Sequence, residues 1–415
     1  MCKRRAPIWP LTVLFAAGLT SCESTDKVLT ATERAIAGRT GQAVVDLARG
    51  KDPAEIAQRR LNEYAQDPER LLKDLRSAQR DFQALYEALT GKVGEQWGKK
   101  EVQLPERKKY VKYTQNYLSR AIVNFDSAEI VVETLDDKNP ERSLRQAVIT
   151  TLLTPQDPRA VDLFSDKEIT LTSEKEPYLL GLVLDQQGRP IRTPADAESF
   201  ATYLLDQRSG TRVVEQGGAK KTATYTTMKM VANLSQKQAE KYRPAVNQFA
   251  QRYNISPSLV FAIIRTESNF NPYAVSSAPA YGLMQLVPTS GGREAYRKAK
   301  GKDVAPTRDY LFDPEQNIEL GTAYLNVLTF NQLEEISHQV SREYCVIAAY
   351  NTGPGNVLRT FSKDRTNAVQ QINALQPASL YERLRGHLPY EETRRYLEKV
   401  TTFRKSFVSS SSQLR

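Results

Sequence analysis

Residues 256–272 read SPSLVFAIIRTESNFNP, and this stretch decides the fold of the second half of the chain. Ser256 and Pro257 are typical of a helix start, because serine caps the first turn and proline needs no backbone donor there. The apolar positions that follow recur at helical spacing and form one face, and Glu267 is the next position on that face. An Asn-x-Asn-Pro sequence comes soon after, so Glu267 is predicted to lie in the last turn.

A carboxyl group that continues an apolar stripe is expected to be desolvated, and Glu267 would also face the negative end of the helix macrodipole. Both effects disfavour the ionised form, so we predict a raised pKa and a substantial protonated fraction near neutral pH, as a general acid requires. The alternative is a structural ion pair with Arg265, Arg293 or another cation, because such pairs also perturb pKa values. For a lone glutamate the ion pair would be favoured, and only the neighbouring sequence reverses that preference.

Two later segments pair glycine with amide and phenol side chains. Residues 281–285 read YGLMQ, and residues 348–355 read AAYNTGPG. Glycine permits close backbone approach, amides and hydroxyls can hydrogen-bond sugar hydroxyls and N-acetyl groups, and tyrosine and methionine offer apolar faces to sugar rings. Each segment alone could be a helix end or a tight turn. Together with Glu267 they indicate a sugar-binding site.

These segments together resemble the lytic transglycosylase family with the soluble-lytic-type catalytic domain. The resemblance covers roughly Arg243 to Val400 and rests on Glu267-Ser268-Asn269-Phe270-Asn271-Pro272, Ser276, Gly282-Leu283-Met284-Gln285 and Ala349-Tyr350-Asn351. It implies a lysozyme-like helical domain that cleaves the β-1,4 bond between N-acetylmuramic acid and N-acetylglucosamine in peptidoglycan glycan strands. It also implies that the muramic sugar leaves with a 1,6-anhydro ring, without water. One departure is Pro279, which stands where a small flexible residue would be ordinary.

The resemblance assigns a role to each matching residue. Glu267 would be the catalytic acid and base: it would protonate the glycosidic oxygen and then accept the proton of the muramic 6-hydroxyl as that oxygen attacks the anomeric carbon. The implied substrate-binding residues are Ser276 and Asn351 near the N-acetyl group and the carboxyl, Met284 and Gln285 along the sugar cleft, Tyr350, which orients the reacting sugar, and Tyr396, a second cleft tyrosine.

A single recycled carboxyl suits this reaction better than ordinary hydrolysis. Glycosidases with two carboxylates hold them about 5 to 9.5 Å apart, and no second acid lies within the resembling motifs. The N-acetyl carbonyl of the substrate could instead stabilise the anomeric carbon. Asp309, Asp313 and Glu315 nevertheless keep open a muramidase that uses water on the same fold. A non-catalytic peptidoglycan-binding lipoprotein, or a main role for residues 110–225 in docking an unknown protein partner, are further alternatives.

The amino terminus has the pattern of a secretion signal. Residues 1–21 combine a basic start, an apolar stretch and small residues before Cys22. The apolar stretch is shorter than the roughly 20 residues of a bilayer span, so a transmembrane helix is disfavoured. Residues 19–22, LTSC, resemble the lipobox of bacterial lipoproteins, which implies a membrane anchor through lipidated Cys22. By the same analogy, Glu23 favours the periplasmic face of the outer membrane.

The chain is predicted to be α+β, with a helical lysozyme-like catalytic domain at the C-terminus preceded by a mixed α+β domain. Residues 128–134 and 179–184 are predicted strands, residues 187–190 a turn, and residues 208–224 a flexible loop or hinge. The expected segments are a lipoprotein signal peptide at 1–21, a helical lead-in at 22–105, an accessory α+β domain at 106–230, the lytic transglycosylase domain at 231–405 and a polar tail at 406–415.

Several helix boundaries are predicted in the second half. Pro244 is expected in the first turn of a helix that Asn254 ends. Asp313 is expected to cap the helix that carries Ile318 and the apolar residues after it, with Gln316 as its partner in a capping box. An amphipathic helix is expected to stop at Gly353.

Composition excludes some functions. A formal charge of +10 over 415 residues favours acidic surfaces, but no basic cluster is interleaved with aromatic residues, so we expect no nucleic-acid partner. Metal-ligand clusters and nucleotide-binding glycine loops are absent from the sequence, and we expect no metal and no cofactor. Cys345 would remain alone in the mature chain, and a buried apolar role is favoured over a nucleophile.

Overall fold

The computed structural model describes residues 68–171 and 176–412, which belong to one compact unit, Arg59–Arg415. The predicted signal peptide and Cys22 lie outside the described residues. Among the helices that are described, none combines the length and the apolar character that a bilayer span requires.

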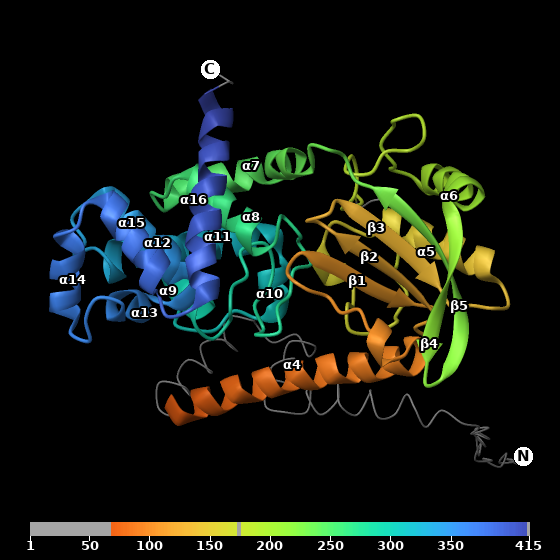
Figure 1. Ribbon diagram of the computed structural model, residues 1–415, viewed down its shortest axis with the longest axis horizontal. Helices are drawn as coiled ribbons and strands as arrows, with labels where there is room; N and C mark the ends of the chain where they lie inside the picture. Colours follow the sequence, from red (N-terminus) through yellow and green to blue (C-terminus); the bar gives the residue numbers. More distant parts are fainter. Residues whose placement is uncertain (1–67, 172–175, 413–415) are drawn as a thin grey trace, which may run out of the picture. The chain divides into compact units, whose positions relative to one another are not determined.

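Residues 68–229, which we call the sheet half, contain a long helix and a five-stranded sheet (Figure 1). The elements in chain order are α4 (Pro68–Trp97), η1 (Lys99–Glu101), β1 (Lys109–Thr114), β2 (Ser119–Asn124), β3 (Glu129–Thr134), α5 (Pro140–Leu152), η2 (Pro158–Ala160), α6 (Pro194–Arg208), β4 (Ser209–Gln216) and β5 (Ala219–Lys229).

The sheet has the order β1-β2-β3-β5-β4, and every neighbouring pair is antiparallel. The strand predicted at residues 128–134 is confirmed as β3, whose Ile130 and Val132 point to one face and are fully buried. Helices α5 and α6 pack against the sheet (Figure 1). The mixed α+β character predicted for this part of the chain is therefore confirmed.

Residues 208–224 form most of a β-hairpin, so the predicted flexible loop is wrong. Strands β4 and β5 pair up to Gln216 and Ala219, and Gly217 and Gly218 make the turn with φ of 54° and 91°. Glycine adopts this left-handed backbone without steric cost, and such two-residue turns match the twist of antiparallel strands. The Gly-Gly pair lies between two threonine-containing segments, and this hairpin signal outweighs the flexible composition.

Residues 179–184, also predicted as a strand, form turns with isolated bridges instead. Gly181 has a φ of 71°, which interrupts an extended backbone. The apolar run reflects burial of a turn rather than a strand. The turn predicted at residues 187–190 is confirmed, since Gly188 has a φ of 78° and its backbone N–H donates to the carbonyl of Asp185.

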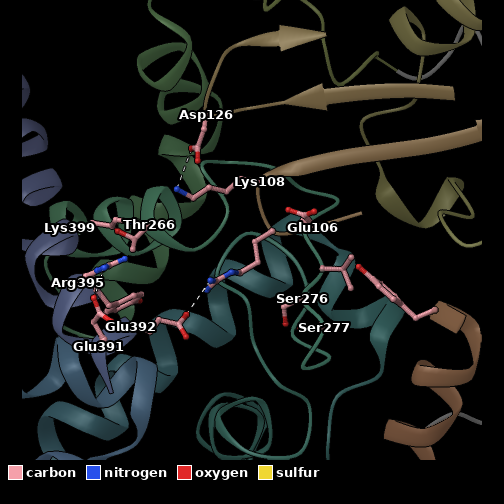
Figure 2. A pocket seen from close by; sticks show the side chains of 14 residues that line it. Glu106, Lys108, Asp126, Thr266, Ser276, Ser277, Glu391, Glu392, Arg395 and Lys399 are labelled. Atoms are coloured by element: carbon pink, nitrogen blue, oxygen red, sulfur yellow. Dashed lines mark hydrogen bonds and ion pairs between the residues drawn. The ribbon is translucent and has the colours of Figure 1, made fainter. Parts of the chain in front are cut away.

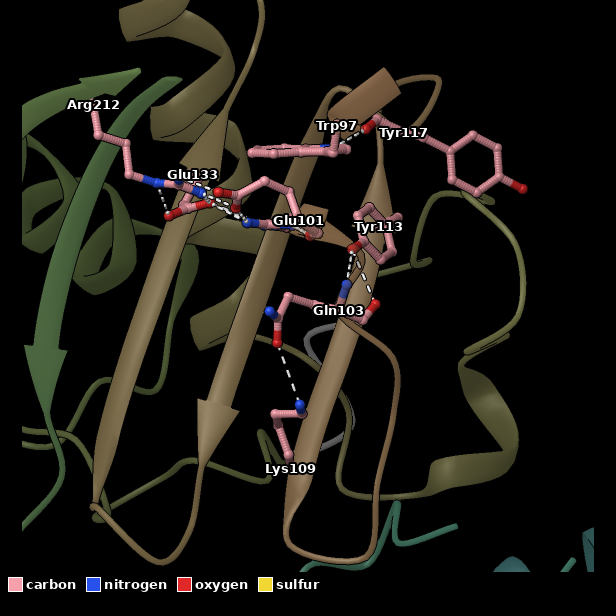
Figure 3. Close-up of polar contacts among 9 residues, drawn as sticks. Trp97, Glu101, Gln103, Lys109, Tyr113, Tyr117, Glu133 and Arg212 are labelled. Carbon is pink, nitrogen blue, oxygen red and sulfur yellow. Dashed lines mark hydrogen bonds and ion pairs between the residues drawn. The ribbon is translucent and has the colours of Figure 1, made fainter. Parts of the chain in front are cut away.

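A buried ionic cluster joins the sheet to the end of α4 (Figure 3). Arg120 of β2 is 2% exposed and donates to the carboxylates of Glu133 and Glu101. Arg212 of β4 donates to the same two carboxylates. The guanidinium of Arg120 also lies 3.8 Å from the ring centroid of Trp97, the last residue of α4. The cluster therefore fixes the long helix to three strands.

Residues 234–412, which we call the helical half, contain no strand. Its elements are α7 (Leu234–Arg252), α8 (Pro257–Glu267), α9 (Gly291–Lys300), α10 (Arg308–Phe312), α11 (Pro314–Val327), the π-helical turn η3 (Leu328–Gln332), α12 (Gln339–Thr352), α13 (Pro354–Arg359), α14 (Arg365–Asn373), α15 (Pro377–His387) and α16 (Glu391–Ser412).

Helix α8 is the core of this half. It packs against α7 and α16, and all of its residues from Leu259 to Ile264 are buried. Helix α16 continues to Ser412, so residues 406–412 of the expected polar tail are helical. The ring of Phe407 stacks on that of Phe261 with centroids 5.3 Å apart, which holds this last part of α16 against α8.

Some of the predicted helix boundaries are confirmed and others are wrong. Pro244 lies inside α7, not in its first turn, because the buried stripe already begins at Leu234. Asn254 follows the end of α7 with a φ of 52°, as expected of a residue that terminates a helix. Asp313 caps α11 as predicted, but the side chain of Gln316 accepts a hydrogen bond from Tyr310, so the capping box is incomplete. The stop at Gly353 is confirmed.

Replacement of Arg120 by leucine is expected to lower the free energy of unfolding by roughly 3 kcal/mol, because it removes one partner of a buried ion pair and leaves Glu133 less compensated. Urea unfolding followed by circular dichroism measures this. Arg192→Leu is the control, because its ion pair with Glu176 is exposed and worth about 1 kcal/mol or less. Equal effects of the two substitutions would contradict a structural role for the cluster.

Candidate active site

Glu267 is the last residue of α8, as predicted, and it is 5% exposed. The next residue fixes the end of the helix, because the hydroxyl of Ser268 donates to the carbonyls of Ile264 and Leu283. The second of these bonds ties α8 to the glycine-containing segment at residues 281–285. Two of the three segments singled out in the sequence therefore meet at the carboxyl.

Gly282 allows this approach. Its φ is 75°, and a Cβ there would come within 2.4 Å of the carbonyl oxygen of Leu311. The buried side chain of Asn317 holds the same segment from α11, since it donates to the carbonyl of Tyr281 and accepts from the backbone N–H of Met284. The segment has one tightly determined conformation beside α8.

The loop after α8 attaches the helical half to the sheet half. Asn269 has a left-handed backbone with a φ of 47°, and its side chain donates to the carbonyl of Phe125 at 2.7 Å. The side chain of Asn271 donates to the carbonyl of Arg107 at 3.1 Å. Both asparagines are buried. They bring the turn after β2 and the loop before β1 to the end of α8.

The cation that pairs with Glu267 comes from the sheet half. Arg107 Nη1 lies 3.6 Å from the Glu267 carboxylate, and Arg107 Nη2 lies 3.1 Å from the carboxylate of Glu392. The two cations considered from sequence have other partners: the guanidinium of Arg265 lies 4.1 Å from the ring centroid of Phe403, and Arg293 pairs with Asp303 at 2.8 Å. An ion pair therefore exists, but with a residue that sequence proximity did not suggest.

Burial raises the pKa of Glu267 from an ordinary 4.5 to about 7. Tyr396, Arg107 and Lys108 lower this pKa and Glu392 raises it, but desolvation is the largest effect. Roughly half of the carboxyl is then protonated near neutral pH. The raised pKa expected from the apolar stripe agrees with this, in spite of the nearby arginine.

Two tyrosines flank the carboxyl, partly buried Tyr350 and buried Tyr396. Tyr350 donates from its hydroxyl to the carbonyl of Met284 at 2.9 Å, and desolvation, with a smaller effect from the charge of Glu267, raises its pKa. Tyr396 is 4% exposed, and its hydroxyl is close enough to lower the pKa of Glu267. The same hydroxyl completes no hydrogen bond of good distance and angle within the described residues. Tyr396 therefore presents its hydroxyl to the carboxyl without holding it in a well-formed hydrogen bond.

A cleft of about 800 Å³ opens beside these residues (Figure 2). Arg107 and Tyr396 line it, so the Glu267 carboxyl lies directly behind its wall. Lys108 and Asp126, on the sheet side of the cleft, form an ion pair of 3.2 Å (Figure 2). The lining comprises Tyr86, residues 106–108 and Asp126 from the sheet half, with Thr266, residues 275–277, Glu391, Glu392, Arg395, Tyr396 and Lys399 from the helical half.

The predicted site residues divide into two groups. Ser276 and Tyr396 line the cleft. Met284 and Gln285 are buried, and the Met284 sulfur lies so close to Gly321 that a Cβ there would be 2.3 Å away. The Met284 side chain therefore packs in the core and does not line the cleft, because α11 offers it a gap at a glycine.

The Asn351 side chain turns toward α16, where its Oδ1 accepts from the hydroxyl of Thr393 at 2.6 Å. This bond ties the end of α12 to the first turns of the helix that carries Tyr396. Asn351 therefore contacts the helix that carries Tyr396, but it is not among the residues that line the cleft.

Sequence reasoning missed most of the charged residues of the cleft. Those on α16 recur at helical spacing, with Glu392, Tyr396 and Lys399 on one face, and that face was a usable signal. Residues 106–108 and Asp126 gave no comparable signal, because they reach the cleft only through the packing of one half on the other.

The remaining candidate groups have other roles. Cys345 is fully buried, and burial raises the pKa of its thiol to about 12, so it has no thiolate character near neutral pH. Asp313 caps α11 and pairs with Arg159, and Asp309 pairs with Arg308. Over the part of the chain that the structure covers, no cluster of three or more histidine, cysteine, aspartate or glutamate side chains could hold a metal ion.

Comparison with known proteins finds a family match for each half. Residues 72–241 match the family described as "Membrane-bound lytic murein transglycosylase C, N-terminal domain", and residues 244–373 match the "Transglycosylase SLT domain". Relatives named membrane-bound lytic murein transglycosylase C in Yersinia pestis and Yersinia pseudotuberculosis are 45% identical over 311 residues, which are 75% of this chain and 85% of theirs.

Two solved structures also match part of the chain. One is an inactive mutant of the lytic transglycosylase Slt from Pseudomonas aeruginosa, with a TM-score of 0.33 and 30% identity over 41% of this chain and 24% of that one. The other is the 70 kDa soluble lytic transglycosylase from Escherichia coli, with a TM-score of 0.31 and 28% identity over 39% and 23% of the two chains.

The Glu267 carboxyl is expected to titrate with a midpoint of about 7, because burial destabilises its charged form. Carbon-13 NMR of protein labelled at the glutamate carboxyls measures this midpoint, and the spectrum of Glu267→Gln assigns the resonance. Exposed glutamates in the same spectra should titrate near 4.3. A Glu267 midpoint in that lower range would contradict desolvation of the site.

The same raised pKa predicts a pH-dependent stability difference. Because the native pKa of Glu267 exceeds its unfolded value, the protonated carboxyl contributes stability below about pH 4.5 that is lost as pH rises through about 7. Glu267→Gln removes this loss, so the variant should gain on the order of 2–3 kcal/mol over the wild type between pH 4 and pH 8. Urea unfolding at both pH values measures the gain, and a constant difference between the two proteins would contradict it.

Proposed function

This chain belongs to the membrane-bound lytic murein transglycosylase C family, and we propose that Glu267 is the single acid and base of its reaction. The chain is a lytic murein transglycosylase, a lyase that acts on peptidoglycan. The observation that carries the proposal for Glu267 is a buried carboxyl with a pKa of about 7 directly behind the wall of a large cleft.

The reaction needs the carboxyl in both protonation states. Protonated Glu267 donates to the glycosidic oxygen, and the bond from that oxygen to the anomeric carbon of N-acetylmuramic acid breaks. The resulting carboxylate then takes the proton of the muramic 6-hydroxyl as its oxygen bonds to the anomeric carbon and closes the 1,6-anhydro ring. The proton balance over one turnover is zero. A pKa near neutrality lets one group serve both steps.

The neighbouring residues have supporting roles in this proposal. The buried hydroxyl of Tyr396 lies beside the Glu267 carboxyl, and we assign it the role of orienting that carboxyl or contacting the reacting sugar. Tyr350 is held by the carbonyl of Met284, so Met284 acts through its backbone and its core packing. Ser276 contacts substrate from the cleft wall, while Gln285 and Asn351 shape the segments behind it.

Hydrolysis by the two-carboxylate route would need a second, free carboxylate near Glu267. Glu392 is the acid whose charge acts on Glu267, but it is 65% exposed and engaged by Arg107 at 3.1 Å. Its ion pair and exposure favour an electrostatic role over that of a nucleophile or base. These features support the one-carboxyl route.

The names of the relatives and the leader sequence support a proposed location for the enzyme. The relatives are named membrane-bound, and we propose the same association for this chain. Lipidation of Cys22 would anchor it after removal of residues 1–21, on the periplasmic face of the outer membrane. In this arrangement residues 22–105 lead in to an accessory domain at 106–230, and residues 231–405 form the catalytic domain.

Product analysis of wild type beside Glu267→Gln tests the proposal. Wild-type digests of purified sacculi should contain 1,6-anhydromuramic products, which are lighter by one water than hydrolytic products in mass spectrometry. The variant should lose at least about 10²-fold in turnover, because the general acid is removed. Glu335→Gln is the matched control, since this glutamate forms an exposed ion pair away from the cleft and should keep full activity.

Three outcomes would contradict the assignment. Products that carry an added water would point to a muramidase. Full turnover by Glu267→Gln would remove the proposed acid, and unchanged binding to sacculi without any turnover in wild type would favour a binding lipoprotein.

A further inference from the structure

The sheet half places the side chain of Arg107 within ion-pair distance of the Glu267 carboxyl. The backbone of Arg107 is fixed from the helical half, because the buried side chain of Asn271 donates to its carbonyl at 3.1 Å. A second bond from the same loop, from Asn269 to the carbonyl of Phe125, fixes the turn beside it. The end of α8 thus determines where Arg107 enters the cleft.

The side chain of Arg107 then lies between two carboxylates. One nitrogen faces buried Glu267 at 3.6 Å, and the other faces exposed Glu392 at 3.1 Å. The shorter contact is with the group that stays in solvent, and the longer one with the group that must exchange a proton. Among the described residues, Arg107 is the one cation within ion-pair distance of Glu267.

We propose that Arg107 is a positioning residue for this reaction: it stabilises the Glu267 carboxylate that exists between the two proton transfers, while Glu392 holds its guanidinium in place. The proposal rests on the assignment of Glu267 as acid and base. It gives the sheet half a part in the chemistry, and Arg107 itself neither gives nor takes a proton.

The reaction creates the need for such a group. After Glu267 has protonated the glycosidic oxygen, its negative charge is left in a buried position, and burial alone would make that state costly. A fixed cation offsets this cost without reorganisation at the moment of reaction. A cation held too tightly would trap the carboxylate and prevent its protonation, and the competing contact with Glu392 limits that effect.

The other charged or titratable groups around Glu267 cannot replace Arg107. Lys108, from the same loop, is paired with Asp126 at 3.2 Å. From α16, Tyr396 is neutral and Glu392 has the opposite charge, and from α12 the hydroxyl of Tyr350 donates to a backbone carbonyl. Removing Arg107 would therefore leave the carboxylate without a cation in contact.

The test is the pH profile of turnover for the full-length enzyme on purified sacculi. Glu267 must be protonated to start the cycle, so activity falls as pH rises through its pKa. Arg107→Gln should lower kcat about 10-fold or more and move this basic limb to higher pH by about 0.5–1 unit, because the carboxylate loses a half-exposed cation. Glu392→Gln should move the limb to lower pH, and Arg107→Lys should restore most of the lost kcat.

Arg365→Gln is the matched control, because Arg365 forms an exposed ion pair with Glu335 away from the cleft, and it should leave both kcat and the limb unchanged. A loss of kcat in Arg107→Gln without a shift of the limb, an effect on KM alone, or shifts of the same direction in Arg107→Gln and Glu392→Gln would each overturn the proposal. Failure of the assignment of Glu267 is distinguishable, because it would appear as full turnover in Glu267→Gln.

Discussion

The desolvation of one carboxyl group is the constraint on which the rest of this structure depends. Glu267 ends a helix whose preceding residues are buried, and that burial raises its pKa to about 7. Helices α7 and α16 pack against α8, and the rigid segment around Gly282 closes its end. A carboxyl with an ordinary pKa would be almost fully ionised at neutral pH and would rarely be able to donate a proton. The packing of the helical half therefore sets the pKa of this carboxyl as well as the stability.

Both halves contribute residues to this site, so the sheet half is more than an attachment for the helical half. Asn269 and Asn271 bind backbone carbonyls of the sheet half immediately after the helix that ends in Glu267. The sheet half in turn supplies Arg107 and one wall of the cleft. Its own rigidity comes from the Arg120 cluster, which joins α4 to the strands at the far end of the sheet from these contacts.

Local sequence patterns correctly predicted the features that depend only on neighbouring residues. The limits of α8, the position of Glu267 in its last turn, the strand β3 and the cap of α11 all follow from spacing and from capping residues, and the structure has each of them. Arg107 could not be found in this way, because it meets Glu267 only through the packing of distant segments. The hairpin of β4 and β5 was missed because a glycine- and lysine-rich composition was given more weight than the Gly-Gly turn signal. Pro244 was misplaced because a proline can also lie inside a helix that packing stabilises.

The shared wall of the cleft has a consequence for how this chain can change over time. A substitution near residues 106–108 alters the surroundings of a carboxyl carried by the other half, and a substitution along the first turns of α16 alters the partner of an arginine carried by the first. The sequence of one half around the cleft therefore cannot change independently of the sequence of the other. Exchange of the amino-terminal portion between homologous enzymes would therefore also replace the surroundings of this carboxyl, and chimeras should work best when the donor preserves both the asparagine contacts and the arginine between the two acids.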